Sequence, residues 1–143
     1  MKLNTTSEYL LRIMSFMVKE EEGKIFTTKE LFENLQIPFR YLRKLMINLS
    51  KSEIIDSIQG KKGGYRIAKN PENITLLEII QTAGEDPIGV MCFFGLEKCE
   101  LVEKCVMHEK WGAVRENIFQ VLSTTTLADI KESEHQNFSF NNN

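Results

Sequence analysis

Hydrophobic residues recur at helical spacing in the first part of the chain. The apolar positions are Tyr9, Leu10, Ile13, Met14, Phe16 and Met17. This spacing predicts a helix that extends to about Val18, with one of the residues 5–7 (Thr, Thr, Ser) as its N-cap. The run KEEEGK over residues 19–24 ends this helix, with Gly23 as the stop. Residues 25–26 are expected to form a short strand.

Two shorter helical patterns come next, separated by a few residues. Thr27 and Glu30 have the spacing of a capping box, and this first helix ends near Gln36 because Pro38 disfavours helical geometry at the residue before it. Pro38 suits the first turn of the second helix, which is predicted over residues 39–51. The buried side of that helix is predicted to consist of Tyr41, Leu42, Leu45, Met46 and Leu49. Two such helices predict a helix-turn-helix, whose second helix enters the major groove of DNA.

A short alternating pattern on each side of a glycine-rich basic turn predicts a β-hairpin. The strands are expected at residues 54–58 and 65–67, on either side of the turn QGKKGG. A basic hairpin directly after a helix-turn-helix is the wing of a winged helix, and this order disfavours the alternative of a solvated loop with incidental lysines. The turn lacks the Gly-x-x-x-x-Gly-Lys-[Ser/Thr] signature of a nucleotide-binding loop.

Three further helices are predicted in the second half of the chain. Thr75 begins a helix that extends to about Thr82, a long helix follows from Val106, and Thr126 caps a short helix over residues 127–132. The long helix carries an apolar stripe of Trp111, Val114, Ile118, Val121 and Leu122. This stripe packs either within the monomer or in a dimer interface, and the length of the helix favours the dimer.

Charge is distributed unevenly along the chain. The 143 residues have a net charge of −2, yet residues 38–70 hold eight basic and two acidic side chains, a local charge of +6. Such a basic segment favours nucleic acid as the partner. The chain has no apolar run of eighteen residues, and its start lacks the features of a signal peptide, so we expect a cytoplasmic protein without a membrane segment.

The basic segment supplies the residues predicted to bind a double-stranded DNA operator. They are Arg40, Tyr41, Arg43 and Lys44 at the start of the recognition helix, and Lys61 and Lys62 on the wing. An arginine side chain can read guanine through two hydrogen bonds in the major groove. The wing lysines are expected to reach the phosphate backbone or the minor groove.

All cysteines of the chain lie within fourteen residues, as Cys92, Cys99 and Cys105, and His108 follows three residues later. Thiolate and imidazole are ligands that suit iron–sulfur clusters, zinc and copper. The intervals of six and five residues differ from the tight pairs of zinc fingers and the short repeats of bacterial ferredoxins. The spacing therefore favours a loop around an iron–sulfur cluster.

Other interpretations of the cysteines stay open at this stage. They include small buried side chains, a metal-free thiol redox switch, a structural zinc site, and an electron carrier or cluster-delivery protein whose basic segment is only a solvated surface. We expect no enzyme, because His108 and His135 are the only histidines and His135 lies in the polar tail.

With these motifs, the chain resembles the IscR/NsrR group of bacterial iron–sulfur transcription regulators, the Rrf-two family. The resemblance covers about residues 1–132. It is most specific in MKLNTTSEYLLR, in GKKGGYRIAKNPENI, in the Cys-x-x-His-x-x-Trp pattern that ends at Trp111, and in TLADI. It implies a homodimer with a long dimerisation helix. It also implies a cluster whose three cysteine ligands correspond to Cys92, Cys99 and Cys105.

The fourth ligand differs within this family. IscR-like members use a histidine three residues after the last cysteine, which corresponds to His108. NsrR-like members use an acidic residue in the first helix of the other subunit, which corresponds to Glu8. The motif match and the soft imidazole favour His108. We expect a 2Fe-2S cluster, with 4Fe-4S as the alternative because the first cysteine interval is six residues instead of the usual five.

The sequence thus predicts a mainly α fold with a small β wing, a winged helix-turn-helix plus a long dimerisation helix. Residues 1–83 form the DNA-binding domain, whose first helix also joins the dimer contacts, and residues 84–105 form the cluster-binding loop. Residues 106–132 form the dimerisation helix and the C-terminal helix, and residues 133–143 are expected to be disordered. The predicted function is a dimeric transcriptional regulator that senses redox state, nitric oxide or iron–sulfur status.

Overall fold

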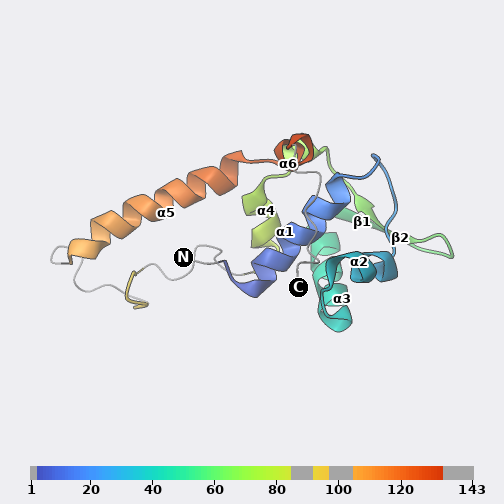
Figure 1. Cartoon of the computed structure of the whole chain (residues 1–143), viewed down its shortest axis with the longest axis horizontal. Helices are drawn as coiled ribbons and strands as arrows, with labels where there is room; N and C mark the ends of the chain where they lie inside the picture. The colour runs from blue at the N-terminus through green and yellow to red at the C-terminus, as the bar shows by residue number, and fades with distance from the viewer. Residues whose placement is uncertain (1–2, 85–91, 97–104, 134–143) are drawn as a thin grey trace.

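The fold consists of a mostly helical body, which includes a two-stranded wing, and one projecting helix (Figure 1). The computed structural model describes residues 3–84, 92–96 and 105–133. In chain order the elements are α1 (Thr5–Val18), α2 (Thr28–Leu35), α3 (Phe39–Lys51), β1 (Ile55–Ile58), β2 (Gly64–Ile67), the 3₁₀ turn η1 (Pro71–Asn73), α4 (Leu76–Gln81), α5 (Val106–Thr124) and α6 (Leu127–Glu132). The predicted fold class is confirmed. The predicted disordered tail, residues 133–143, lies outside the described residues apart from Ser133.

Helix α1 forms the centre of the hydrophobic core. Its side chains Leu10, Ile13 and Met14 are fully buried, which the apolar spacing of the sequence predicted. The cap differs from the prediction, because the side chain of Asn4 accepts a hydrogen bond from the backbone N–H of Ser7 at 2.8 Å. Several adjacent residues here could cap a helix, and Asn4 is the one in extended geometry just before it.

The helix-turn-helix has the bounds that local signals predicted. Thr27 caps α2 by accepting a hydrogen bond from the backbone N–H of Glu30 at 3.0 Å. Gln36, with a φ of 53°, ends α2 in left-handed geometry. Pro38 then occupies the N-cap of α3, which spans the predicted residues 39–51 and buries Leu42, Leu45, Met46 and Leu49.

The wing is an antiparallel pair of β1 and β2, which contact α3 and α1 and are joined by one β-bridge to the segment before α2. Ile55 pairs with Ile67, and Ile58 pairs with Gly64. The expected strand at residues 25–26 is a single bridge, in which Phe26 exchanges two backbone hydrogen bonds with Tyr65 at 2.7 and 2.8 Å. A Cβ atom at Gly64 would lie 2.3 Å from the carbonyl oxygen of Phe26, so this close approach requires glycine.

Helix α6 packs on the body, although it follows α5 in the chain. Leu127 is fully buried, and its backbone N–H donates to the carbonyl oxygen of Ile74 at 2.9 Å. The sequence-based division grouped α6 with α5, but its contacts place α6 beside α1 and η1. None of the helices in the described ranges is long and apolar enough to cross a membrane.

Candidate functional site

The exposed face of α3 presents most of the predicted DNA-binding residues. Arg40, Arg43 and Lys44 are exposed, on the side of α3 opposite to its buried leucines. Lys61 and Lys62 are exposed in the turn between β1 and β2. Five of the six predicted residues therefore lie on solvent-accessible surfaces of the two elements that a winged helix uses on DNA.

Tyr41 differs from the other five residues. It is half-buried, its hydroxyl forms a hydrogen bond with the Thr6 hydroxyl of α1, and its ring meets that of Tyr9 edge-on at 5.6 Å. These contacts favour a role in fixing α3 on α1. The spacing of Tyr41 with Leu45 and Leu49 in the sequence carried this signal, since residues four apart share one face of a helix.

Helix α5 projects from the body as an arm (Figure 1), and several of its hydrophobic side chains are exposed. Towards its C-terminal end, Ile118 and Leu122 pack against Leu77 and Ile80 of the body. Elsewhere on the arm Val114 is 45% exposed and Val121 is 60% exposed. The predicted stripe therefore divides into a part that packs within the monomer and a part that does not.

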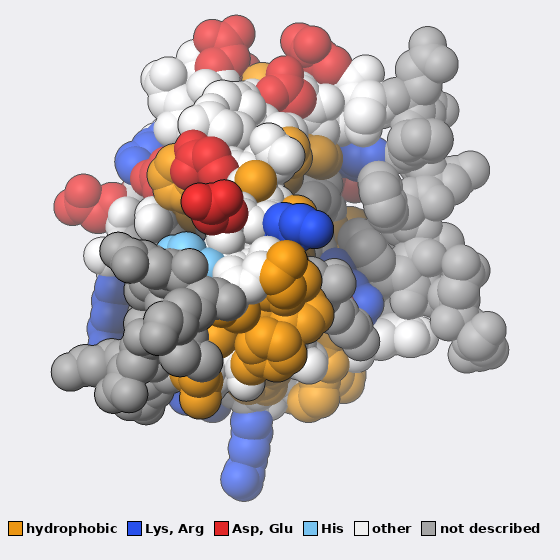
Figure 2. Space-filling view, turned by 90° about the vertical axis from the view of Figure 1, so that its left-hand side faces the viewer, with side chains coloured by type: hydrophobic (Ala, Val, Ile, Leu, Met, Phe, Trp, Pro, Cys, Tyr) orange, Lys and Arg blue, Asp and Glu red, His pale blue; other side chains and the backbone are white. Residues whose placement is uncertain are grey.

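The outer end of α5 carries the predicted ligand residues. Cys105 is the N-cap residue of α5, and the backbone N–H of His108 donates to the Cys105 carbonyl oxygen at 3.1 Å. This bond confirms the prediction that Cys105 and His108 lie one helical turn apart. Figure 2, which views the molecule from this end, shows hydrophobic side chains gathered there.

A turn at residues 92–95 brings a second cysteine to the same place. The turn closes with a hydrogen bond from the Gly95 N–H to the Cys92 carbonyl oxygen at 3.0 Å. The ring of Phe93 packs edge-on against Trp111 of α5, with the ring centres 5.6 Å apart. As a result, one cavity of about 10 Å³ is lined by Cys92, Phe93, Phe94, Cys105, Met107, His108 and Trp111.

The donor groups around this cavity fit a soft or borderline metal, although they are not assembled around one. Two thiols and an imidazole are such ligands, and Cys92 and Cys105 are half-buried. The indole N–H of Trp111 is buried and has no hydrogen-bond partner among the described residues, so a nearby acceptor such as a sulfur would satisfy it. A cavity of about 10 Å³ holds about one water molecule, so these side chains would have to separate to accept a cluster.

The other two candidate ligand residues are Cys99 and Glu8. Cys99 lies outside the described residues, and within the described ranges no group of three histidine, cysteine or carboxylate side chains could hold a metal ion. Glu8 is half-buried in the first turn of α1 and does not line the cavity.

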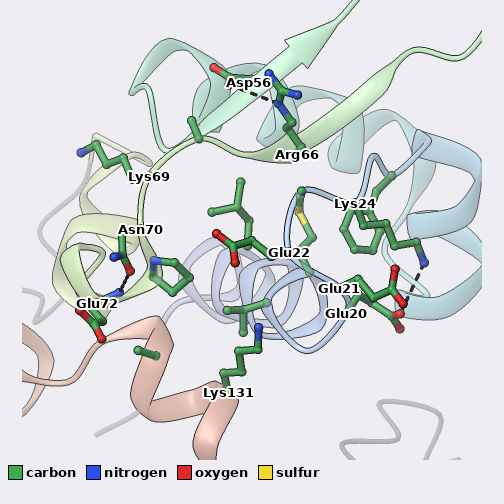
Figure 3. A pocket seen from close by; sticks show the side chains of 18 of the residues that line it. Glu20, Glu21, Glu22, Lys24, Asp56, Arg66, Lys69, Asn70, Glu72 and Lys131 are labelled. Carbon is green, nitrogen blue, oxygen red and sulfur yellow. Dashed lines mark hydrogen bonds and ion pairs between the residues drawn. The ribbon is translucent and has the colours of Figure 1, made fainter.

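A larger cavity lies elsewhere, where the end of α1 meets the root of the wing and α6 (Figure 3). Its volume is about 590 Å³, and the side chains of Glu22 and Lys131 point into it. Ion pairs form part of its wall, with Lys24 at 3.6 Å from Glu20 and Arg66 at 3.6 Å from Asp56. The hydrogen bond that Lys24 donates to Glu30 raises the pKa of Lys24. None of the predicted site residues lines this cavity.

Known proteins with the same architecture are regulators. The Rrf2 (Rrf-two) family, described as iron-dependent transcriptional regulators, matches residues 3–133. The regulator NsrR of Bacillus licheniformis is 29% identical over 131 residues, which are 91% of this chain and 92% of that protein.

Two solved structures are similar along nearly the whole chain. CymR of B. subtilis, described as a global cysteine regulator, has a TM-score of 0.76 at 29% identity and covers 92% of this chain and 96% of its own. IscR of T. potens has a TM-score of 0.75 at 26% identity and covers 96% of this chain and 92% of its own. The chain therefore belongs to the Rrf2 family of helix-turn-helix transcriptional regulators, which are not enzymes.

Proposed function

We propose that this transcriptional regulator is a homodimer whose binding to a DNA operator depends on an iron–sulfur cluster. The ligands are Cys92, Cys99, Cys105 and His108. The observation that carries the proposal is the cavity at the outer end of α5, which Cys92, Cys105 and His108 all line. The similarity to NsrR and IscR, within a family described as iron-dependent, supports the same chemistry.

The residues around the cavity have distinct parts in holding such a group. Thiolates of the three cysteines bind iron, and the imidazole of His108 supplies the fourth ligand. When bound, the cluster supplies a reversible one-electron couple and sites that react with small oxidants. The buried Trp111 N–H would be a hydrogen-bond donor beside such a group, and donors of this kind tune reduction potential. We propose 2Fe-2S, with 4Fe-4S as the alternative.

The dimer is proposed from the exposed part of α5. Val114 and Val121 lie seven residues apart on one side of the helix, which is the repeat that helix pairs use. Pairing along α5 would place two winged helices on one DNA duplex, with half-sites about one helical turn, ~34 Å, or a multiple apart. Such a regulator acts where the chromosome is, so a cytoplasmic location belongs to the proposal.

Coupling between cluster and DNA would act through α5. Because Cys105 is the N-cap of α5, loss of a bound cluster would change contacts at the outer end of the helix that is proposed to join the subunits. A change in that helix alters the relative placement of the two DNA-reading faces, so cluster state and operator affinity become linked. The signal is then redox state, nitric oxide or cluster supply, each of which acts on the cluster.

The test is purification without oxygen, followed by DNA binding of the loaded and cluster-free protein. We expect visible absorption, iron and sulfide in stoichiometric amounts, and operator affinities that differ between the two forms. Equal affinity and equal sequence preference would remove the sensing role. A colourless protein with one zinc ion per chain would assign the cysteines to a structural site.

A metal-free thiol switch is the second candidate, favoured by the similarity to CymR. Cys92 and Cys105 line one cavity, so oxidation there would change the same end of α5. This candidate predicts a colourless protein whose operator affinity changes when a thiol oxidant is added and recovers with a reductant. Iron and sulfide in the anaerobic protein would contradict it.

A further inference from the structure

The DNA-reading face of α3 contains apolar side chains among its basic ones. Phe39, the first residue of α3, is 44% exposed, and Ile47 two turns later is exposed as well. Arg43 lies between them at helical spacing, so the three residues form one exposed stripe. The two apolar side chains in this stripe lie outside the core, so a partner can cover them.

The ring of Phe39 is held in place from two sides. Phe32 of α2 meets it edge-on, with ring centres 5.6 Å apart and planes at 86°. Pro38 occupies the N-cap position just before it and restricts the backbone there. Phe39 is therefore a rigid apolar group at the N-terminal end of the recognition helix, the end whose residues contact base edges.

The charged neighbours indicate which partner covers this ring. Arg40, Arg43 and Lys44 are exposed around it, so the surface attracts a polyanion and disfavours a purely apolar protein surface. On the floor of the major groove the one apolar group is the C5-methyl of thymine, which phenylalanine can contact. The ring and its surroundings thus match a thymine that is flanked by phosphates and by bases that accept hydrogen bonds from arginine.

We propose that Phe39, positioned by Phe32, contacts the C5-methyl group of a thymine in each operator half-site and is a specificity-determining residue. This inference rests on the proposed operator binding and adds a base-reading contact to it. The sequence pattern did not identify Phe39, because a lone aromatic residue at a helix start has no periodic signal. Its exposure and its contact with Phe32 identify it.

The experiment removes single methyl groups from the DNA. An operator is first selected with the anaerobic, cluster-containing protein. Each thymine of that duplex is then replaced, one at a time, by deoxyuridine, which lacks only the C5-methyl. At one position in each half-site we expect wild-type binding to weaken about fourfold, the effect of losing burial of one methyl-sized group, about 0.8 kcal/mol.

Protein variants then tie that methyl group to Phe39. With Phe39→Ala the thymine and deoxyuridine duplexes should bind equally, while Phe39→Leu should keep part of the preference. Lys61→Ala is the matched control, because a lost phosphate contact weakens both duplexes alike. A wild-type protein that ignores every replacement, or a Phe39→Ala variant with the wild-type preference, would overturn the inference. A protein that binds no duplex better than random DNA would instead overturn the proposed operator binding.

Discussion

The winged-helix body and the α5 arm differ in how far each is completed by its own contacts. The body comprises α1 to α4, the wing and α6; the arm is α5 with the turn at residues 92–95. Six of the fourteen residues of α1 are buried, but only one of the nineteen residues of α5 is. The helices α1, α2, α4 and α6 have side-chain caps at their N-termini, whereas Cys105 forms no capping hydrogen bond for α5.

This difference is the basis for placing the proposed second subunit and the proposed cluster on the arm. Most helical stability in proteins comes from packing of an apolar face, and α5 packs such a face over only part of its length. We therefore propose that the rest of its apolar surface binds a second subunit and that the cavity at its outer end holds a bound group. The body by contrast has a closed core, so its stability should depend little on either partner.

Loss of a cysteine ligand tests this comparison most strongly. Cys92→Ala or Cys105→Ala should abolish visible absorption and bound iron, because each removes a thiolate, and Cys99→Ala should do the same. The thermal unfolding midpoint of the body should stay close to wild type. The measurements are an anaerobic spectrum, iron analysis and calorimetry, with Ser57→Ala on the wing as a control. Retained iron in the Cys105→Ala variant would break the assignment.

Charges on the arm should separate the subunits. Val114→Glu combined with Val121→Glu should weaken the dimer by more than about a hundredfold, because unpaired carboxylates in an apolar interface cost several kcal/mol. Sedimentation over a concentration series measures this effect. Glu116→Gln on the same helix is the control and should leave the dimer intact. A dimer unchanged by both glutamates would place the interface elsewhere.

The two candidates for the fourth ligand, His108 and Glu8, predict opposite outcomes when each is replaced by alanine. If His108 binds the cluster, His108→Ala should shift the visible spectrum or speed cluster loss, and Glu8→Ala should leave the spectrum unchanged. If Glu8 of the other subunit binds it, these results exchange, and cluster content should also fall in the glutamate variant that weakens the dimer. Anaerobic spectra and timed iron release measure both. A His108→Ala spectrum that overlays the wild type would move the assignment to Glu8.

Two variants of the body should distinguish base reading from binding to the DNA phosphate backbone. Arg43→Ala should cost roughly 1–3 kcal/mol on the best operator and relax the preference there, as expected for a lost contact with guanine. Lys61→Ala should weaken all sequences alike and lower the slope of affinity against salt by about 1. Titrations at several salt concentrations measure both. Equal proportional losses of specific and random binding in the two variants would contradict this division.

The sequence predicted the body well because its signals are local. Pro38 and the apolar spacing after it gave the bounds of α3, and Thr27, Thr75 and Thr126 marked the starts of three helices correctly. Each of these signals acts within one or two helical turns. Local geometry also predicted that Cys105 and His108 share one turn.

The sequence could not predict features that depend on distant contacts. The Tyr41 hydroxyl forms a hydrogen bond with Thr6, which is 35 residues away in the chain. Tertiary packing therefore decides whether the Tyr41 side chain contacts α1 or DNA. The approach of Cys92 to Cys105 depends on the Phe93–Trp111 contact, which no spacing rule describes. The identity of the cofactor and the geometry of the dimer could not be predicted either, because both depend on atoms outside a single chain.

The variant with the smallest expected effect, Thr126→Ala, tests whether α6 belongs to the body or to the arm. Thr126 caps α6 in a capping box: its hydroxyl oxygen accepts a hydrogen bond from the Asp129 N–H at 3.3 Å, and its own N–H donates to the Asp129 carboxylate at 2.8 Å. Thr126→Ala removes the hydroxyl cap and should lower the free energy of unfolding by about 1 kcal/mol. Denaturant titration measures this value. Iron content and dimerisation should not change, because α6 packs on α1 and η1.

Thr124→Ala provides the matched control, since it makes the same chemical change at the last residue of α5. The Thr124 hydroxyl donates to the Gln120 carbonyl oxygen at 2.7 Å. This bond satisfies no backbone group that the helix leaves unpaired, so its loss should change the free energy of unfolding by less than about 0.5 kcal/mol. If Thr126→Ala and Thr124→Ala gave equal values, α6 would unfold independently of the core. The boundary between body and arm would then lie before α6, because only an element within the cooperative core passes its cap energy to global unfolding.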